Sequence, residues 1–591
     1  MKRKTKSNVD PVMMAILANR VDGILREMTN TLLQTARSGV INSARDFSCS
    51  ICTGKGDLFA VAEGLPIHIF GSGIQAKKIV TMHKDLKEGD CYLDNDPYHG
   101  NTHAADHTFL VPIYWGEEHL FTAIAKAHQA DVGNSLPTTY MATAKDIYEE
   151  GALIFSATRI QRDYKMNEDL IRMMEKRIRV PSQWFGDFLA GISSVRIAEK
   201  RFKEMFKKYG KETIKEFIEK WMDYSELRMV QALKSLPSKQ ISGKAKHDPT
   251  PFLPEGIPLQ VQINIENKAA KVEIDLTKNI DNVECGYNQS EATAISSVMA
   301  GLFNCLDPDI PKNAGSFRRV NVKLREGCVT GKPLFPASCS VATTNVSDRM
   351  VNLTGHTMSK LGSGYGLAES ALGLGIGMAV VSGLDPRKNN EPFVNQLHLT
   401  ANGGPASSSA DGWATFGLPV IAGLMYRDSI EVDELKHPME IRRLALIPGS
   451  AGAGKYRGGL SLEIEICAKA NNFTVIYPGD GQEYPPRGAR GGQDGLPAER
   501  WVVRKSGAKE KLGNAQEVTL NYDDVVKGRD CSGGGYGSPR LRNKLSVLTD
   551  VEDGFETIAR AQKLYQVIIK SDASGVLTID ENKTKKLRSG K

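Results

Sequence analysis

The sequence DHTFLVPIYWGEEHLFTAIAKAH, residues 106–128, predicts a β-hairpin, because two runs rich in β-branched and aromatic residues flank a Gly-Glu-Glu turn. A three-residue turn pairs Trp115 with His119, and the same register places Asp106 opposite His128. Directly opposed residues of antiparallel strands have Cβ atoms about 4.5–5.5 Å apart. A carboxylate and an imidazole are therefore expected side by side at the open end of this hairpin. Another turn length would shift the pairing by one residue.

Two more residues can join this pair. His103 lies three residues before Asp106, and Asp46 stands at the mouth of an earlier predicted hairpin, residues 47–62. Two imidazoles and two carboxylates suit zinc, manganese or iron, and an open position on such a metal would hold water. The spacing alone leaves two interpretations, a metal site and a hydrogen-bonded polar cluster.

Two other residue pairs have spacings typical of metal or thiol sites, but the surrounding sequence excludes both. His103 and His107 are four apart, as in zinc proteases, but no Glu follows the first His and His107 begins a strand. Cys49 and Cys52 lie three apart on a predicted strand, so they face opposite sides and cannot chelate together.

Residues 449–455, Gly-Ser-Ala-Gly-Ala-Gly-Lys, imitate a phosphate-binding loop. Tyr456 stands where a Ser or Thr would hold magnesium, and a strand rather than a helix is predicted to follow. We interpret this segment as a glycine-rich turn between strands.

The rest of the chain mixes helical and strand patterns. Asp10 and Pro11 suit an N-cap and a first helical position, and apolar residues then recur at helical spacing to residue 33. The remaining predictions are helices over most of residues 144–236, strands at 259–265 and 270–276, helices at 292–306 and 549–565, and short strands among the glycines of 398–537. The last twenty residues are expected to be disordered.

A chain of 591 residues is too long for a single core. We predict an α+β, multidomain protein with mixed sheets, a helical insertion and a glycine-rich, β-containing C-terminal half. The predicted parts are an N-terminal metal-site domain with a helical segment (1–237), a linker (238–258), a mixed α/β domain (259–397), a glycine-rich β domain (398–540) and a C-terminal helix with a basic tail (541–591).

Charge and composition exclude several classes of function. The net charge is +7, but nine cations lie in the first six and last nine residues, so the body of the chain carries no basic excess. A nucleic-acid-binding protein would carry that excess on its folded surface, so no nucleic acid partner is expected. Nine thinly spread cysteines do not suggest a disulfide framework and favour a reducing compartment.

One stretch, residues 366–384, approaches the length of a membrane span. It contains Glu369 and several glycines, so we interpret it as a buried helix or a tightly packed glycine-rich segment. With no visible signal peptide, the chain is predicted to be cytoplasmic and not membrane-bound.

Several segments together resemble the hydantoinase B/oxoprolinase family over residues 8–540. They are Asn95-Asp96-Pro97-Tyr98, Thr102-His103-x-x-Asp106, His128-x-x-Asp131-Val132-Gly133, Leu306-Asp307-Pro308-Asp309-Ile310-Pro311, residues 449–459, and Gly533-Gly534-Gly535-Tyr536-Gly537. One departure is Gln129, where the family often has an aromatic residue or His.

The resemblance implies a hetero-oligomer with a hydantoinase A-like subunit that binds ATP and magnesium and phosphorylates the carbonyl oxygen of a small substrate. This chain would then be the metal-dependent subunit of an ATP-driven cyclic amide hydrolase, opening a hydantoin, oxoproline or lactam ring. The implied ligands of one divalent metal are Asp46, His103, Asp106 and His128. Asp131 and Asp96 are the candidate catalytic carboxylates, with loop capping as the alternative for both.

The same resemblance covers the catalytic subunits of ATP-dependent ketone carboxylases, and no residue separates ring opening from carboxylation. The chain is shorter than expected for that carboxylase subunit, which favours the hydrolase. A third hypothesis is a non-catalytic scaffold of such a complex, although a scaffold would not need a complete ligand set.

Overall fold

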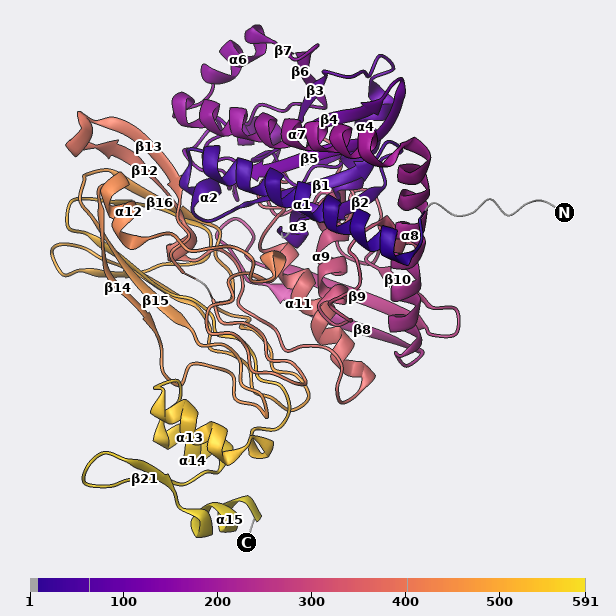
Figure 1. Cartoon of the computed structure of the whole chain (residues 1–591). Helices are drawn as coiled ribbons and strands as arrows, with labels where there is room; N and C mark the ends of the chain where they lie inside the picture. The colour runs from indigo at the N-terminus through magenta and orange to yellow at the C-terminus, as the bar shows by residue number, and fades with distance from the viewer. Residues whose placement is uncertain (1–8, 63, 401, 590–591) are drawn as a thin grey trace. The chain divides into compact units, whose positions relative to one another are not determined.

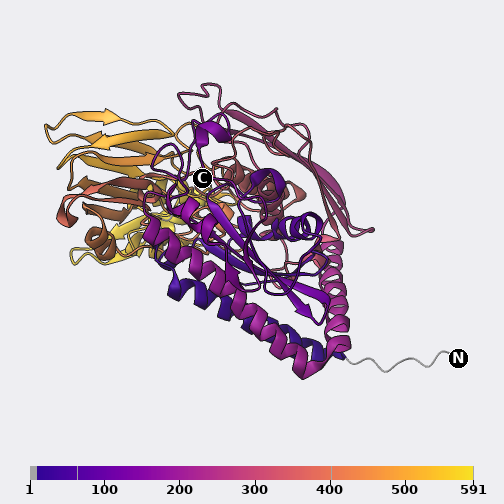
Figure 2. The ribbon, with the colours of Figure 1, turned by 90° about the horizontal axis from the view of Figure 1, so that it is seen from above.

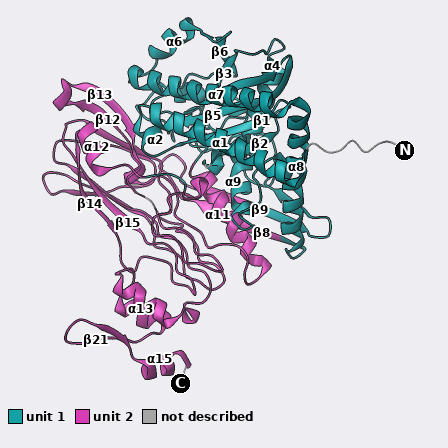
Figure 3. Cartoon of the chain, viewed as in Figure 1, with its two compact units in different colours: residues 1–240, 262–343, 424–426 teal, residues 241–261, 344–423, 427–591 magenta. Residues whose placement is uncertain are grey.

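The computed structural model describes residues 9–62, 64–400 and 402–589 and contains two compact units (Figures 1 and 3). Unit 1 comprises residues 1–240, 262–343 and 424–426; unit 2 comprises residues 241–261, 344–423 and 427–591. Helices and several mixed sheets make the chain α+β and multidomain, as the sequence predicts.

An antiparallel seven-stranded sheet lies at the centre of unit 1. Its order is β2-β1-β5-β4-β3-β6-β7. The strands are β1 (Phe47–Thr53), β2 (Leu58–Val61), β3 (Cys91–Asp94), β4 (Asp106–Trp115), β5 (Glu118–His128), β6 (Thr158–Arg162) and β7 (Lys165–Met166). The sequence predicts the β1–β2 and β4–β5 hairpins but not β6 and β7, which lie where mainly helix is expected.

The β4–β5 register confirms the pairing of Asp106 with His128. The predicted turn is wrong by one residue, because Trp115 pairs with Glu118 and Tyr114 with His119. An irregularity between Ile113 and Tyr114 restores the predicted register along the rest of the hairpin.

Two long helices, α1 (Pro11–Thr35) and α7 (Pro181–Tyr209), lie side by side over one face of this sheet (Figure 2). The Asp10 side chain caps α1 as predicted, accepting a hydrogen bond from the Met13 amide at 2.8 Å. Gly191 lets α7 approach β4, because a Cβ there would lie 2.3 Å from the Phe109 ring.

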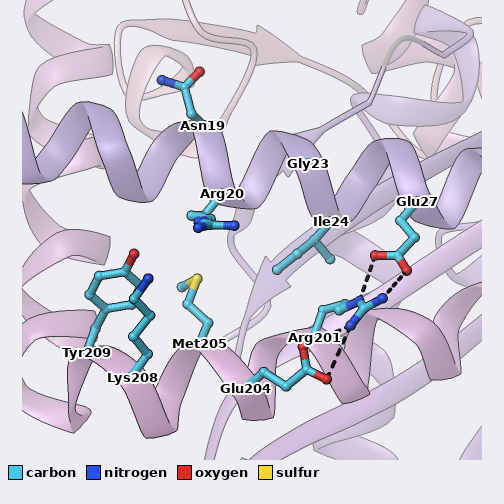
Figure 4. Close-up of a pocket in the computed structure, with 10 residues that line it drawn as sticks. All are labelled: Asn19, Arg20, Gly23, Ile24, Glu27, Arg201, Glu204, Met205, Lys208 and Tyr209. Atoms are coloured by element: carbon cyan, nitrogen blue, oxygen red, sulfur yellow. Dashed lines mark hydrogen bonds and ion pairs between the residues drawn. The ribbon is translucent and has the colours of Figure 1, made fainter.

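A groove of about 430 Å³ runs between α1 and α7 on their outer side (Figure 4). Ile24 and Met205 form part of its floor, and Arg201 of α7 pairs with Glu27 of α1 at 2.6 Å. Gly23 also lines the groove, and nothing lies within 4 Å of the place where its Cβ would be.

The opposite face of the sheet packs against α3 (Pro66–Ile69) and α4 (Ser72–Met82), around a second apolar core that includes Leu110 and Ile124. Cys52 belongs to this core, whereas Cys49 belongs to the core under α1 and α7. The two thiols thus lie on opposite faces, as expected for residues three apart on a strand.

Further helices and a second sheet complete this part of the chain. The helices are α2 (Gly39–Asn42), α5 (Ile147–Glu150), α6 (Glu168–Glu175), α8 (Lys211–Lys234), α9 (Glu291–Phe303) and α10 (Ala314–Phe317). A four-stranded sheet has the order β11 (Val320–Lys323), β10 (Lys271–Asp275), β9 (Ile257–Glu266), β8 (Lys239–His247). The predictions for α9, β9 and β10 are confirmed, whereas β8 occupies residues expected to form a linker.

Unit 2 is built largely on two sheets that share an apolar core. One has the order β13 (Glu391–Gln396), β12 (Val380–Asp385), β16 (Phe473–Tyr477), β19 (Gln516–Leu520). The other has the order β14 (Met439–Leu446), β15 (Leu462–Ala468), β20 (Val525–Arg529), β17 (Glu499–Val503), β18 (Lys509–Lys511). Residues 449–455 form turns between β14 and β15, as predicted, and the helices here are α11 (Val346–Met358) and α12 (Ile430–Lys436).

Glycines allow three backbone segments of unit 2 to meet. A Cβ on Gly403 would lie 2.3 Å from the Gly459 carbonyl oxygen and 2.7 Å from the Gly533 amide nitrogen. This contact explains why glycine pairs and triplets recur at these three places in the sequence.

The C-terminal part differs from its prediction. Two helices, α13 (Lys544–Glu552) and α14 (Ile558–Tyr565), replace the single helix expected at residues 549–565. The expected disorder of the last twenty residues is wrong up to Ser589, because β21 (Ile569–Ser571), β22 (Leu577–Ile579) and α15 (Glu581–Ser589) follow. Lys2, Arg3, Lys4 and Lys6 of the predicted basic tails lie outside the described residues.

Residues 366–384 form a buried glycine-rich segment that ends in β12, one of the two structures predicted for them. Across the described residues, every helix is too short or too polar to span a bilayer.

Candidate metal centre

Three neighbouring strands place Asp46, His128 and Asp106 in a row. Asp106 begins β4, His128 ends β5, and Asp46 directly precedes β1. The His128 amide donates to the Asp46 carbonyl at 3.0 Å, which continues the β1–β5 register by one residue. Antiparallel pairing therefore gathers residues that are far apart in the chain.

The loop before β4 carries His103 and is fixed by two buried asparagines. The Asn101 side-chain amide donates to the carbonyl oxygens of His103 and Asp106 at 2.7 and 2.9 Å. Asn95 donates to the Ala104 carbonyl at 2.8 Å. Gly100, with φ of 104°, supplies the left-handed turn that leads into this loop.

Three donor atoms meet at the end of the hairpin. His103 Nε2 lies 3.0 Å from Asp106 Oδ1 and 3.2 Å from His128 Nδ1, and His128 Nδ1 lies 3.1 Å from Asp106 Oδ1. All three side chains are at most 1% exposed. Within the described part of the chain, these residues form a cluster with the spacing of a metal-ligand set.

The hydrogen bonds on the far side of each ring favour a cation between them. His103 Nδ1 lies 2.8 Å from the Ser340 carbonyl oxygen, which can only accept, so this nitrogen carries a proton. The Nε2 of a neutral His103 then turns a lone pair toward the Asp106 carboxylate. His128 Nε2 lies 3.0 Å from the Thr139 hydroxyl, which leaves its Nδ1 facing the same point. Converging lone pairs held by outer partners fit a metal ion.

The pKa shifts agree with this interpretation. Burial raises the pKa of Asp106, but His103 and His68 outweigh burial and hold that pKa well below its ordinary range. Burial lowers the pKa of His103, and Asp106 more than compensates, so the net shift is upward. Asp106 therefore stays a carboxylate, and a proton on His103 satisfies the place that a metal ion would take.

Asp46 lies beside the triad rather than within it. Its Oδ1 is 3.8 Å from His68 Nε2, and His68 Nε2 is 3.2 Å from Asp106 Oδ2. Burial raises the pKa of Asp46, although His128 and His68 oppose the rise. The structure thus brings three of the four expected ligands together, places Asp46 beside them and adds His68.

The two predicted catalytic carboxylates have other partners. Asp131 accepts hydrogen bonds from the Gly133 amide at 3.0 Å and from Arg179 Nη1 at 3.0 Å. Asp96 caps a short helix through the Tyr98 amide at 3.0 Å and pairs with Lys78 at 3.3 Å. Both therefore fix loops next to the ligand-bearing segments, and a part in the chemistry stays a prediction.

Two buried groups near the triad are not singled out by the sequence. The Tyr140 ring stacks on His128 with centroids 5.2 Å apart. Lys126 pairs with Thr108 in the β4–β5 register, on the same face as His128, and among the described residues its Nζ has no hydrogen-bond partner. Burial lowers the pKa of Lys126 to about 8, although Asp106 and Asp94 oppose the shift.

Nothing local in the sequence marks His68, Tyr140 or Lys126 as part of a site. His68 follows an ordinary Leu-Pro-Ile run, and Lys126 lies near the end of a largely apolar strand. The β4–β5 register could have indicated Lys126, because it lies two residues before His128 on the same face.

Comparison with known proteins gives consistent results. The profile of the hydantoinase B/oxoprolinase family matches residues 10–539. The beta subunit of the caprolactamase of Pseudomonas jessenii is 28% identical over 97% of this chain and 98% of its own length. The B component of a putative D-/L-hydantoinase from a Pseudomonas strain is 26% identical over 98% of each chain. The crystal structure of the ATP-dependent caprolactamase from Pseudomonas jessenii aligns with a TM-score of 0.86, at 25% identity, over 98% of this chain and 100% of that one.

Proposed function

This chain belongs to the hydantoinase B/oxoprolinase family, and we propose that it is the metal-dependent catalytic subunit of an ATP-driven hydrolase that opens cyclic amides. The observation that carries the proposal is the triangle of His103 Nε2, Asp106 Oδ1 and His128 Nδ1, with sides of 3.0, 3.1 and 3.2 Å. The Ser340 carbonyl, which can only accept, holds His103 as the tautomer whose Nε2 lone pair faces the Asp106 carboxylate.

The reaction divides between two subunits. An amide carbonyl is a poor electrophile because its nitrogen donates electron density, and phosphorylation of the carbonyl oxygen by a partner ATPase turns that oxygen into a leaving group. When bound here, a divalent metal would supply Lewis acidity and lower the pKa of water toward neutrality. The relative from Pseudomonas jessenii is a beta subunit by name, which supports a second subunit for this chain as well.

The chain's own residues hold the reacting groups. His103, Asp106 and His128 would bind the metal, and Asp46, which lies beside them next to His68, would be the fourth ligand. Asp131 or Asp96 would accept the proton of the attacking water, Asp131 being three residues from His128. Two faces of the site are closed by the buried Tyr140 ring and the Ser340 carbonyl, which keep both imidazoles in place.

The donor set suits zinc, manganese or iron, because all three accept imidazole and carboxylate ligands. Two histidines and one carboxylate would leave positions open on such a metal for water and substrate.

The test co-expresses this chain with a hydantoinase A-like subunit. The complex is loaded with manganese and incubated with ATP and a hydantoin, 5-oxoproline or a lactam, with and without ¹³C-bicarbonate. Mass spectrometry follows ring-opened and carboxylated products, and metal content is measured on the same samples. We expect ring opening that needs the partner, ATP and metal, and no ATP hydrolysis by this chain alone.

Each other outcome has a definite meaning. Incorporation of ¹³C into the product would show that the enzyme is a ketone carboxylase and not a hydrolase. If the wild-type chain binds no metal, alone or with its partner, and supports no turnover, the non-catalytic scaffold is the hypothesis that remains. Hydrolysis of ATP by the pure chain would contradict the division of labour.

A further inference from the structure

His68 contacts the Asp106 carboxylate through the oxygen that His103 and His128 do not contact. It lies on α3 and is 2% exposed. Its Nε2 is 3.2 Å from Asp106 Oδ2 and 3.8 Å from Asp46 Oδ1. It therefore touches the oxygen of Asp106 that does not belong to the ligand triangle.

The polarity of the hydrogen bonds around His68 is determined by its neighbours. The Leu65 amide donates to Ser48 Oγ at 2.9 Å, which leaves the Ser48 proton free to donate elsewhere. Ser48 Oγ lies 3.4 Å from His68 Nδ1. The Asp106 carboxylate oxygen Oδ2 can only accept, so His68 Nε2 carries a proton and donates it there, and Nδ1 of the neutral ring accepts from Ser48.

The backbone near Ser48 and His68 allows these two residues to lie close together. A Cβ on Gly64 would lie 2.8 Å from Ser48 Oγ, so glycine allows the chain before α3 to pass directly over Ser48. The Ser72 hydroxyl donates to the His68 carbonyl at 3.0 Å and ties α3 to the start of α4. The imidazole is thus fixed on both its ring and its backbone.

We propose that His68 is a positioning residue that keeps Asp106 bound to the metal through one oxygen. Asp106 Oδ2 accepts from the Thr102 hydroxyl as well as from His68, and two donors on this oxygen turn Oδ1 toward the triangle. An Asp106 held in this way cannot chelate through both oxygens, so one more coordination position stays open for substrate. The inference rests on the metal centre of the proposed function.

Removal of the ring and replacement of its hydrogen bond have different consequences. His68→Ala removes the donor to Oδ2, whereas His68→Gln offers an amide N–H of similar reach but no imidazole. Outer partners of metal ligands change metal affinity by about 10- to 100-fold. A positioning role thus predicts a large loss in the alanine variant and substantial rescue in the glutamine variant.

The experiment titrates Mn²⁺ alone into the full-length chain. Calorimetry gives the affinity, and electron paramagnetic resonance gives the symmetry of the bound ion for wild type, His68→Ala, His68→Gln and Ser48→Ala. His119→Gln is the matched control, because His119 lies at the far end of β5 and pairs with Tyr114 rather than with the site. We expect affinity to fall about 10- to 100-fold in His68→Ala, less in Ser48→Ala and least in His68→Gln, with a changed spectrum in His68→Ala.

The outcomes separate this inference from the metal centre itself. Wild-type affinity and spectrum in both His68→Ala and Ser48→Ala would overturn the positioning role while leaving the centre intact. Equal, large losses in His68→Gln and His68→Ala would overturn it in favour of direct ligation by His68. A wild-type chain that binds none of Mn²⁺, Fe²⁺ and Zn²⁺ would refute the centre, and the role of His68 with it. If His68→Ala does not fold, the comparison of Ser48→Ala with His119→Gln decides.

Discussion

At the scale of single residues, the centre depends most on Asp106, which serves the triangle through Oδ1 and accepts from Thr102 and His68 through Oδ2. Asp106→Asn keeps the shape of the side chain but removes the negative charge. We expect loss of bound metal and turnover at least ~100-fold lower, with an unchanged circular dichroism spectrum. Metal analysis by plasma mass spectrometry checks this. A variant that retains a full equivalent of metal would exclude Asp106 as a ligand.

Asp131→Asn is the matched carboxylate control, because Asp131 is also buried but bonds to Arg179 and Gly133. The variant should retain its metal. If Asp131 is the general base, turnover of the metal-loaded complex should still fall, by about 10²–10⁴-fold. Unchanged turnover would leave Asp131 with the loop-capping role alone.

Sequence reasoning reaches residues that pair through a regular register and misses those that meet through the tertiary fold. Asp106 and His128 can be paired because both belong to one hairpin. The Ser340 carbonyl that fixes His103 lies 237 positions later in the chain, and no local pattern connects the two. His68 escapes prediction for the same reason, since α3 reaches the site only by packing on the sheet.

At the scale of elements, two mid-helix glycines offer opposite expectations. Gly23 of α1 has open space around an added Cβ, so Gly23→Ala should raise the free energy of unfolding by about 0.5–1 kcal/mol. A Cβ on Gly191 of α7 would lie 2.3 Å from the Phe109 ring, so Gly191→Ala should lower the free energy of unfolding by about 1–3 kcal/mol. Urea unfolding of the two variants checks both signs. Stabilisation by Gly191→Ala would contradict the close packing of α7 on β4.

The β4–β5 hairpin shows why elements are more predictable than their details. Apolar alternation indicates both strands and the register of their open end. The predicted turn is one residue too long, because the irregularity at Ile113 and Tyr114 leaves no sequence signal. Strands β6, β7 and β8 are not predicted because each is short or polar. Strands β7 and β8 also lie at the edges of their sheets.

At the scale of the whole molecule, a buried ion pair should contribute to the acid sensitivity of unit 2. Burial raises the pKa of Asp480, but Arg349, at 2.7 Å, and His247 lower it to about 2. This pKa lies below the value of ~3.9 in the unfolded chain. The pair therefore adds ~2–3 kcal/mol to the free energy of unfolding above about pH 4, and this contribution is lost as the pH falls toward 2.

Arg349→Met should therefore cost about 3–5 kcal/mol at pH 7, since it leaves a buried carboxylate unpaired. The difference from wild type should shrink as the pH falls toward 2, because the wild type loses the contribution of the ionised pair below about pH 4, whereas the unpaired Asp480 of the variant takes up a proton at a higher pH. Urea unfolding of unit 2 between pH 7 and pH 3 measures this. A difference that does not change with pH would show that Arg349 stabilises the unit by packing alone.

Metal should stabilise one unit and not the other. All residues of the proposed centre, including Ser340, belong to unit 1. A ligand at about 100 times its dissociation constant adds about 2.7 kcal/mol to the unit that binds it. Removal of metal by chelation should lower the unfolding transition of unit 1 in calorimetry and leave that of unit 2 in place. An equal shift of both transitions would contradict this assignment.

The discontinuous course of unit 1 also sets an order of events during synthesis. The proposed ligands His103, Asp106 and His128 leave the ribosome well before Ser340, which follows His103 by 237 residues. At about 5–20 residues per second this delay is roughly 10–50 s. During that time the nascent hairpin holds an imidazole that is free to rotate and to bind whichever ion is most available. Selection of the correct metal therefore requires the complete chain, in which Ser340 holds His103. Slow translation would favour binding of the wrong ion.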